Sequence, residues 1–108
     1  EVGWEKRSAL PAISLCVDPA VITSIANDYG FEYVFERQLQ ALANPQDLLI
    51  TLSTSGKSVN CVRALKYAKG YGMDFIDWPR CPGKTVGIQE FQLKLMHHVC
   101  ELVERHYV

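Results

Sequence analysis

A short run of hydroxyl residues, Ser53-Thr54-Ser55-Gly56-Lys57-Ser58, is the part of the sequence best suited to chemistry. We call residues 53–58 the serine loop. An apolar run precedes it, and a segment with apolar residues at helical spacing follows it. The first N–H groups of a helix lack partners and carry the positive end of its dipole, so a phosphate binds well there. Hydroxyls add donors and Gly56 lets the backbone approach the anion, so Ser53, Thr54, Ser55 and Ser58 are candidate phosphate ligands.

The plainer interpretation of the serine loop is an ordinary helix N-cap, for which one hydroxyl is enough. Four hydroxyls in six positions exceed that need and favour an anion site. Lys57 either adds charge to the site or is simply solvated. The loop matches neither G-x-x-x-x-G-K-[ST] nor G-x-G-x-x-G, so no nucleotide cofactor is indicated.

The elements that must position this loop alternate between strands and helices, which predicts an α/β fold with a parallel sheet flanked by helices. Asp18 and Pro19 are expected as the N-cap and first residue of a helix. Three strands are few for such a sheet, which suggests that part of it lies outside this sequence. We expect one domain over residues 1–108, with strands at 9–17, 47–53 and 73–76, helices at 19–28, 31–43, 59–69 and 86–106, and a loop at 78–84.

Composition excludes several classes of function. The net charge is -1 and the eleven Lys and Arg residues are scattered, which argues against nucleic-acid binding. The apolar stretches have the length of strands, so no membrane span is expected. Glu1 is not a start residue and no leader follows it, so we expect an internal stretch of a longer, cytoplasmic polypeptide. The four cysteines lack metal or disulfide spacing and suit a reducing compartment.

The serine loop resembles the S-T-S-G-x-S phosphate loop of the SIS (sugar isomerase) domain. Further stretches narrow the resemblance to phosphoheptose isomerases, which interconvert sedoheptulose 7-phosphate and D-glycero-D-manno-heptose 7-phosphate. They run in the family's order along the chain and comprise Asn27-Asp28-Tyr29-Gly30-Phe31, then Phe35-Glu36-Arg37-Gln38 followed by Leu42 and Asp47-Leu48-Leu49-Ile50, and finally Ile88-Gln89-Glu90 with His97 eight residues after Gln89.

The resemblance implies a three-layer, flavodoxin- or Rossmann-like SIS fold and a homotetramer with active sites at subunit interfaces. It implies that the serine loop holds the phosphate of a sugar phosphate and that Asn27 and Asp28 lie near the sugar. Gln89 and His97 would lie at the reacting end, with His97 as the catalytic acid and base. Both are also possible ligands of a zinc ion that some members bind.

Helical spacing supports a shared flank for the last pair. At about 100° per residue, Gln89 and His97 lie about 80° apart, whereas His98 points away from Gln89. The alternatives are a surface role for His97 and a simple helix C-terminal turn for Asn27 and Asp28.

Two departures from the family keep a second hypothesis open, a non-catalytic SIS protein that binds a sugar phosphate or a protein such as the replication initiator. The family's first strand, its G-N-G-G-S-like loop and a helix with His and Glu would all precede Glu1. The family also has a helix and a strand between the counterparts of Ile76 and Ile88, and residues 77–87 are too few to hold them. We expect omitted stretches there rather than a degenerate member, because the motifs on both sides are intact.

Overall fold

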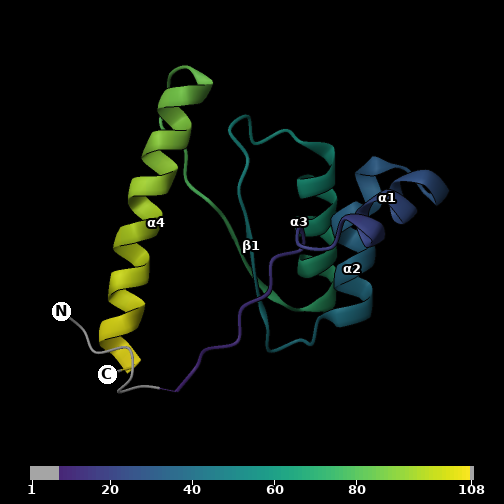
Figure 1. Cartoon of the computed structure of the whole chain (residues 1–108), viewed down its shortest axis with the longest axis horizontal. Helices are drawn as coiled ribbons and strands as arrows, with labels where there is room; N and C mark the ends of the chain where they lie inside the picture. Colours follow the sequence, from purple (N-terminus) through teal and green to yellow (C-terminus); the bar gives the residue numbers. More distant parts are fainter. Residues whose placement is uncertain (1–7, 108) are drawn as a thin grey trace. The chain divides into compact units, whose positions relative to one another are not determined.

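The computed structural model describes residues 8–107. The described residues divide into two compact units, one formed by Ser14–Trp78 and the other by residues 8–13 together with residues 79–107. The first unit contains the sheet and most of the helices (Figure 1). Its elements are α1 (Pro19–Asp28), the 3-10 helix η2 (Phe31–Tyr33), α2 (Val34–Leu42), β1 (Leu48–Thr51), α3 (Val59–Tyr71) and β2 (Asp74–Asp77).

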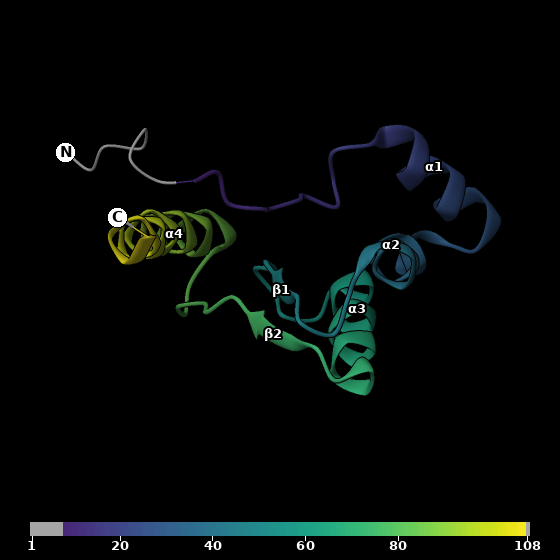
Figure 2. The same cartoon turned by 90° about the horizontal axis from the view of Figure 1, so that it is seen from below.

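The sheet has two parallel strands, β1 and β2, which are joined through α3. Leu48 pairs with Asp74 and Thr51 with Asp77, so both strands end at the same edge. This β1–α3–β2 unit, with helices alongside the strands, confirms the predicted α/β class with a parallel sheet (Figure 2). Because the strands end together, the serine loop leaves the sheet at its carboxyl edge, where α/β folds bind ligands.

The core of this unit lies between α2, α3 and the sheet. Ala64 and Ala68 are buried one helical turn apart on α3, and their small side chains let the helix approach the sheet closely. They pack in one cluster with Leu39, Leu49 and Met73. The alternating burial of β1 follows, since Leu49 faces this cluster while Leu48 and Ile50 are exposed.

Local signals place the start of α1 as the sequence predicts and end α3 before a glycine, two residues beyond the expected helix at 59–69. The carboxylate of Asp18 accepts hydrogen bonds from the N–H groups of Ala20 at 3.0 Å and Val21 at 3.3 Å, and Pro19 opens α1. Gly72 ends α3 in the left-handed conformation, with φ of 78°. The expected helix at 31–43 begins instead as one turn of 3-10 helix, η2, before α2.

The strand expected at residues 9–17 is wrong. Residues 8–14 form no helix or strand, and a turn begins at Leu15. A strand needs a neighbour for its N–H and C=O groups, and Pro11 has no N–H to donate. The sheet in the described part of the chain consists of β1 and β2, and most side chains of residues 8–17 are exposed. An apolar run alone therefore did not make a strand here.

The second unit is dominated by one long helix, α4 (Thr85–Tyr107), which closely matches the predicted helix at 86–106. Residues 78–84 form the predicted loop before it. Ile88 and Gln92 are buried, one turn apart, whereas Gln89 and Glu90 are exposed. None of the helices in residues 8–107 has an apolar stretch long enough to cross a bilayer.

Candidate phosphate site

The serine loop connects the carboxyl end of β1 to the first turn of α3. Ser53 is buried and Thr54 is half-buried, while Ser55 and Ser58 are exposed. Gly56 has φ of 71°, a left-handed conformation that side chains disfavour. The sequence predicted a special backbone role for this glycine, and its conformation is consistent with one.

Hydrogen bonds centre the loop on Ser53. Its hydroxyl oxygen accepts from the N–H of Gly56 at 3.0 Å and lies 3.2 Å from the hydroxyl of Ser58 and 3.4 Å from that of Ser55. The hydroxyl of Ser55 accepts from the N–H of Lys57 at 3.0 Å. Three of the four predicted hydroxyls thus come together on a tight turn, in which the N–H groups of Gly56 and Lys57 donate to the hydroxyl oxygens of Ser53 and Ser55. An anion at this turn would be met by the serine hydroxyls as donors.

The first turn of α3 is not closed by a conventional cap. Ser58 occupies the N-cap position, yet its side chain makes no capping hydrogen bond. The side-chain oxygen of Asn60 accepts a hydrogen bond from the N–H of Cys61 at 2.8 Å. The plain N-cap interpretation therefore does not account for Ser58, whose hydroxyl faces Ser53 instead. A dianion at this end would meet the helix dipole and several hydroxyl donors.

Polar groups that the sequence analysis did not single out lie beside the loop. The hydroxyl of buried Thr51 donates to the carboxylate of Asp77 at 3.4 Å across the two strand ends. The thiol of Cys61 lies 4.0 Å from the carbonyl oxygen of Leu52. Burial raises the pKa of the Cys61 thiol, and the Asp77 carboxylate and Cys16 raise it further. Parallel pairing, which aligns Thr51 with Asp77, is the signal that could have found this neighbour.

Asn27 and Asp28 form the exposed C-terminal end of α1. The amide of Asn27 lies 3.5 Å from the carboxylate of Asp28, a contact at the limit of a hydrogen bond. Helix α1 packs against η2 and α2. This position fits a helix C-terminal turn, and a role of the pair near the sugar stays a prediction.

Gln89 and His97 are both exposed on α4, in the second unit of the chain. Eight residues on a helix correspond to an axial rise of about 12 Å. A zinc site takes three or four protein ligands, and these two donors are not enough. No group of three or more His, Cys, Asp or Glu side chains within residues 8–107 could hold a metal ion. The described residues therefore do not form a complete zinc site.

A protein-family model described as SIS domain matches residues 5–77 of the chain. These residues include the sheet, α3 and the serine loop. The chain belongs to this family. The SIS domain match covers the serine loop, Asn27 and Asp28, and it stops where β2 ends, before Gln89 and His97.

Individual relatives of this SIS domain are phosphoheptose isomerases. The chain is 43% identical to the enzyme of Synechocystis sp. over 114 residues, covering 91% of this chain and 59% of the relative. It is 41% identical to the enzyme of Helicobacter pylori, covering 94% and 62%. The solved phosphoheptose isomerase from Francisella tularensis superposes with a TM-score of 0.88 at 30% identity, covering 94% of this chain and 63% of that one. The chain is thus a homologue of these isomerases that spans less than two thirds of their length.

The relatives also differ from this chain inside the matched stretch. The Synechocystis alignment has 114 positions, more than the 108 residues of the chain, although only 91% of the chain takes part. The relative therefore has additional residues within the aligned stretch.

Proposed function

We propose that this SIS domain binds the phosphate of a sugar phosphate through the serine loop and acts in the interconversion of sedoheptulose 7-phosphate and D-glycero-D-manno-heptose 7-phosphate. The observation that carries the proposal is the uncapped start of α3, where the hydroxyls of Ser53, Ser55 and Ser58 converge at the carboxyl edge of the sheet. Homology to phosphoheptose isomerases at about 40% identity supplies the sugar and the reaction.

Aldose–ketose interconversion moves a proton between adjacent carbons through an enediolate. It requires a base at carbon, an acid at the carbonyl oxygen and a fixed substrate. The serine loop is the anchor in this scheme. His97 is the proposed acid and base, since imidazole exchanges protons near neutral pH. The remaining groups would come from outside residues 8–107, and a homotetramer with sites at its interfaces would provide one route.

Gln89 and His97 would be two of the ligands of a zinc ion, and a zinc site would need at least one further protein ligand. The serine loop offers hydroxyls and amides rather than metal ligands, so we expect chelator treatment to leave phosphate affinity unchanged.

A second candidate function is sugar-phosphate binding without turnover. The observation that favours it is the serine loop itself, whose hydroxyl groups contact one another and two N–H groups within residues 53–58. The serine loop would serve such a protein equally well, whereas His97 would have no role in it.

Two measurements test these proposals. Calorimetric titration with sedoheptulose 7-phosphate and with inorganic phosphate should show binding that Ser58→Ala weakens by about tenfold, because a charge-assisted hydrogen bond is lost. Ser24→Ala makes the same chemical change on exposed α1 and should bind normally. Equal affinity in both variants would refute the phosphate site.

Turnover followed by NMR separates the enzyme from the binding protein. His97→Gln should abolish isomerisation while leaving phosphate affinity intact, and His98→Gln should retain turnover. Full activity of His97→Gln would rule out its catalytic role, and binding without any turnover in the wild-type chain would favour the second candidate.

A further inference from the structure

One guanidinium group connects three elements behind the phosphate loop. Arg63 lies in the second turn of α3, and its Nε donates to the carboxylate of Glu36 on α2 at 2.8 Å. The Glu36 side chain is 16% exposed and that of Arg63 is 36% exposed, so this ion pair is partly shielded from solvent. The other carboxylate oxygen of Glu36 accepts from the amide of Gln40 at 3.4 Å.

The same guanidinium also stacks on an aromatic ring. Its central carbon lies 4.0 Å from the ring centroid of Tyr33, which belongs to η2. The stack on Tyr33 fixes the plane of the guanidinium, and the ion pair with Glu36 fixes the direction in which its Nε–H points. Arg63, Glu36 and Tyr33, which we call the Arg63 cluster, therefore link α3 to both α2 and η2.

The Arg63 cluster acts next to the start of α3. Arg63 is four residues after Val59, the first residue of the helix, so it lies one helical turn from the N–H groups that face the serine loop. A helical turn is rigid, and a residue that fixes it against α2 also fixes the direction of those N–H groups. Binding sites depend on such support, because small displacements of the ligating groups weaken them.

We propose that Arg63 is a positioning residue for the phosphate site, holding the first turns of α3 in the orientation that the serine loop needs. This inference rests on the proposed function, since it assumes that the serine loop binds phosphate. Arg63 acts through α3 and does not touch the ligand in this scheme.

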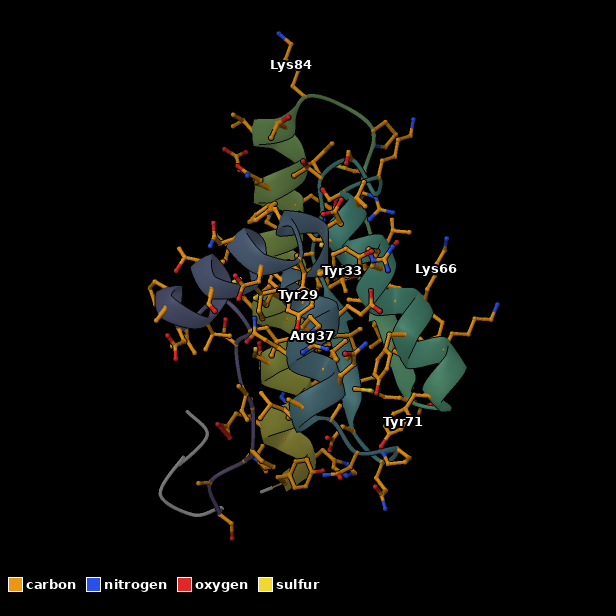
Figure 3. The ribbon with its side chains drawn as sticks, turned by 90° about the vertical axis from the view of Figure 1, so that its right-hand side faces the viewer. Tyr29, Tyr33, Arg37, Lys66, Tyr71 and Lys84 are labelled. Atoms are coloured by element: carbon orange, nitrogen blue, oxygen red, sulfur yellow. The ribbon has the colours of Figure 1, made fainter. Side chains whose placement is uncertain are left out.

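The chain contains a matched control for this chemistry. Arg37 on α2 lies 4.5 Å from the ring centroid of Tyr29, and its guanidinium donates to the Tyr29 hydroxyl at 3.4 Å and to Gln40 at 3.1 Å. Figure 3 labels Tyr29 and Arg37, which form this stacked pair. The stacked Arg37 thus contacts a residue just after α1 and a residue of α2, and it reaches α3 only indirectly, through the side chains of Gln40 and Glu36.

The test compares Arg63→Gln with Arg37→Gln in the full chain, using inorganic phosphate as the probe. Affinity is measured by calorimetry at a low temperature at which circular dichroism shows both variants folded. Arg63→Gln should bind phosphate about fivefold more weakly, whereas Arg37→Gln should match the wild type. Arg63→Lys should recover part of the loss, because it keeps the charge but not the planar stack and fork.

A purely structural role gives a different result. Arg63→Gln would then unfold at a lower temperature but bind phosphate with wild-type affinity while folded, and this outcome would overturn the inference. Ser58→Ala keeps the two proposals apart. If it leaves phosphate binding unchanged, the phosphate site itself is wrong. If it weakens binding while Arg63→Gln does not, only the role of Arg63 is wrong.

Discussion

The hydroxyl of Ser53 is the most connected group of the serine loop, and it is also its most buried one. It accepts from the N–H of Gly56 and contacts the hydroxyls of Ser55 and Ser58. Ser55 is exposed and holds only the outer part of the turn. We therefore expect Ser53 to contribute to both phosphate binding and stability, and Ser55 to contribute mainly to binding.

Substitution should separate these two contributions. Ser53→Ala should weaken phosphate binding and lower the free energy of unfolding by about 1–2 kcal/mol, because the half-buried N–H of Gly56 and the hydroxyl of Ser58 lose a partner at a buried position. Ser55→Ala should weaken binding with a change in unfolding free energy below about 0.5 kcal/mol, as is usual for an exposed site. Urea denaturation and phosphate titration of both variants provide the comparison. Equal stability of the two variants would contradict the central position of Ser53.

The Cys61 thiol beside the loop makes stability depend on pH. Burial raises its pKa, with further contributions from Asp77 and Cys16, so the folded chain keeps this proton to a higher pH than the unfolded chain does. The stabilisation is complete below the ordinary thiol pKa and is lost as pH rises through the higher, folded value. Urea denaturation from pH 7 upward should therefore show a decline in alkaline solution that Cys61→Ala reduces.

The carboxylate contribution can be tested on the same thiol. Asp77→Asn removes a like charge and should speed iodoacetamide alkylation of Cys61 about twofold at pH 8, because more thiolate is present. Asp74→Asn, at the opposite end of β2, is the control and should leave the rate unchanged. Identical rates in both variants would show that Asp77 does not act on this thiol.

At the scale of elements, two glycines two residues apart on α3 should respond in opposite ways to alanine. Gly72 has φ of 78° and Gly70 lies inside the helix, and neither would bring a new Cβ within 4 Å of another group. Only backbone conformation then matters. Gly72→Ala should destabilise by about 1 kcal/mol and Gly70→Ala should stabilise by about 0.5–1 kcal/mol, measured by thermal or urea unfolding. A loss of stability in both would indicate an unrecognised contact.

Elements defined by local chemistry could be predicted from the sequence. Asp18 and Pro19 specify the start of α1, and Gly72 specifies the end of α3, because caps and left-handed turns depend on a few adjacent residues. The apolar run at 9–17 failed because a strand depends on a pairing partner, which the sequence of the run does not contain. Its hydrophobicity was real, but hydrophobicity does not supply a neighbouring strand.

Within the candidate site, too, local contacts could be predicted from the sequence and long-range contacts could not. The serine loop could be recognised because its residues are contiguous, and their mutual hydrogen bonds span at most five positions. The Arg63–Glu36 pair spans 27 positions, and Asp77 meets Thr51 across 26. The Arg63–Glu36 contact follows from how α2 and α3 pack, which no spacing along the chain reveals, whereas the Thr51–Asp77 contact follows from the register of the two parallel strands.

At the scale of the whole molecule, anion binding and proton transfer have different requirements. The serine loop, α3 and the Arg63 cluster all belong to residues 14–78, so the proposed phosphate site lies within that unit. His97 and Gln89 belong to the other unit, and the proposed reaction would need further acid–base groups in addition. General acid–base catalysis by one group contributes about 10²–10⁴-fold, which is a fraction of what an isomerase requires.

Protein concentration should therefore affect the two activities differently. If neighbouring chains complete the active site, turnover per chain should rise as dilute protein is concentrated through its assembly range, because mass action then forms the interfaces. Phosphate affinity per chain should stay constant over the same range. Isomerisation by NMR, phosphate titration and sedimentation velocity at matched concentrations make the comparison, with Ser55→Ala as a variant that changes affinity without changing assembly. Constant turnover per chain across dissociation would show that one chain carries the whole reaction, and a concentration-dependent phosphate affinity would show that the serine loop is not complete within a single chain.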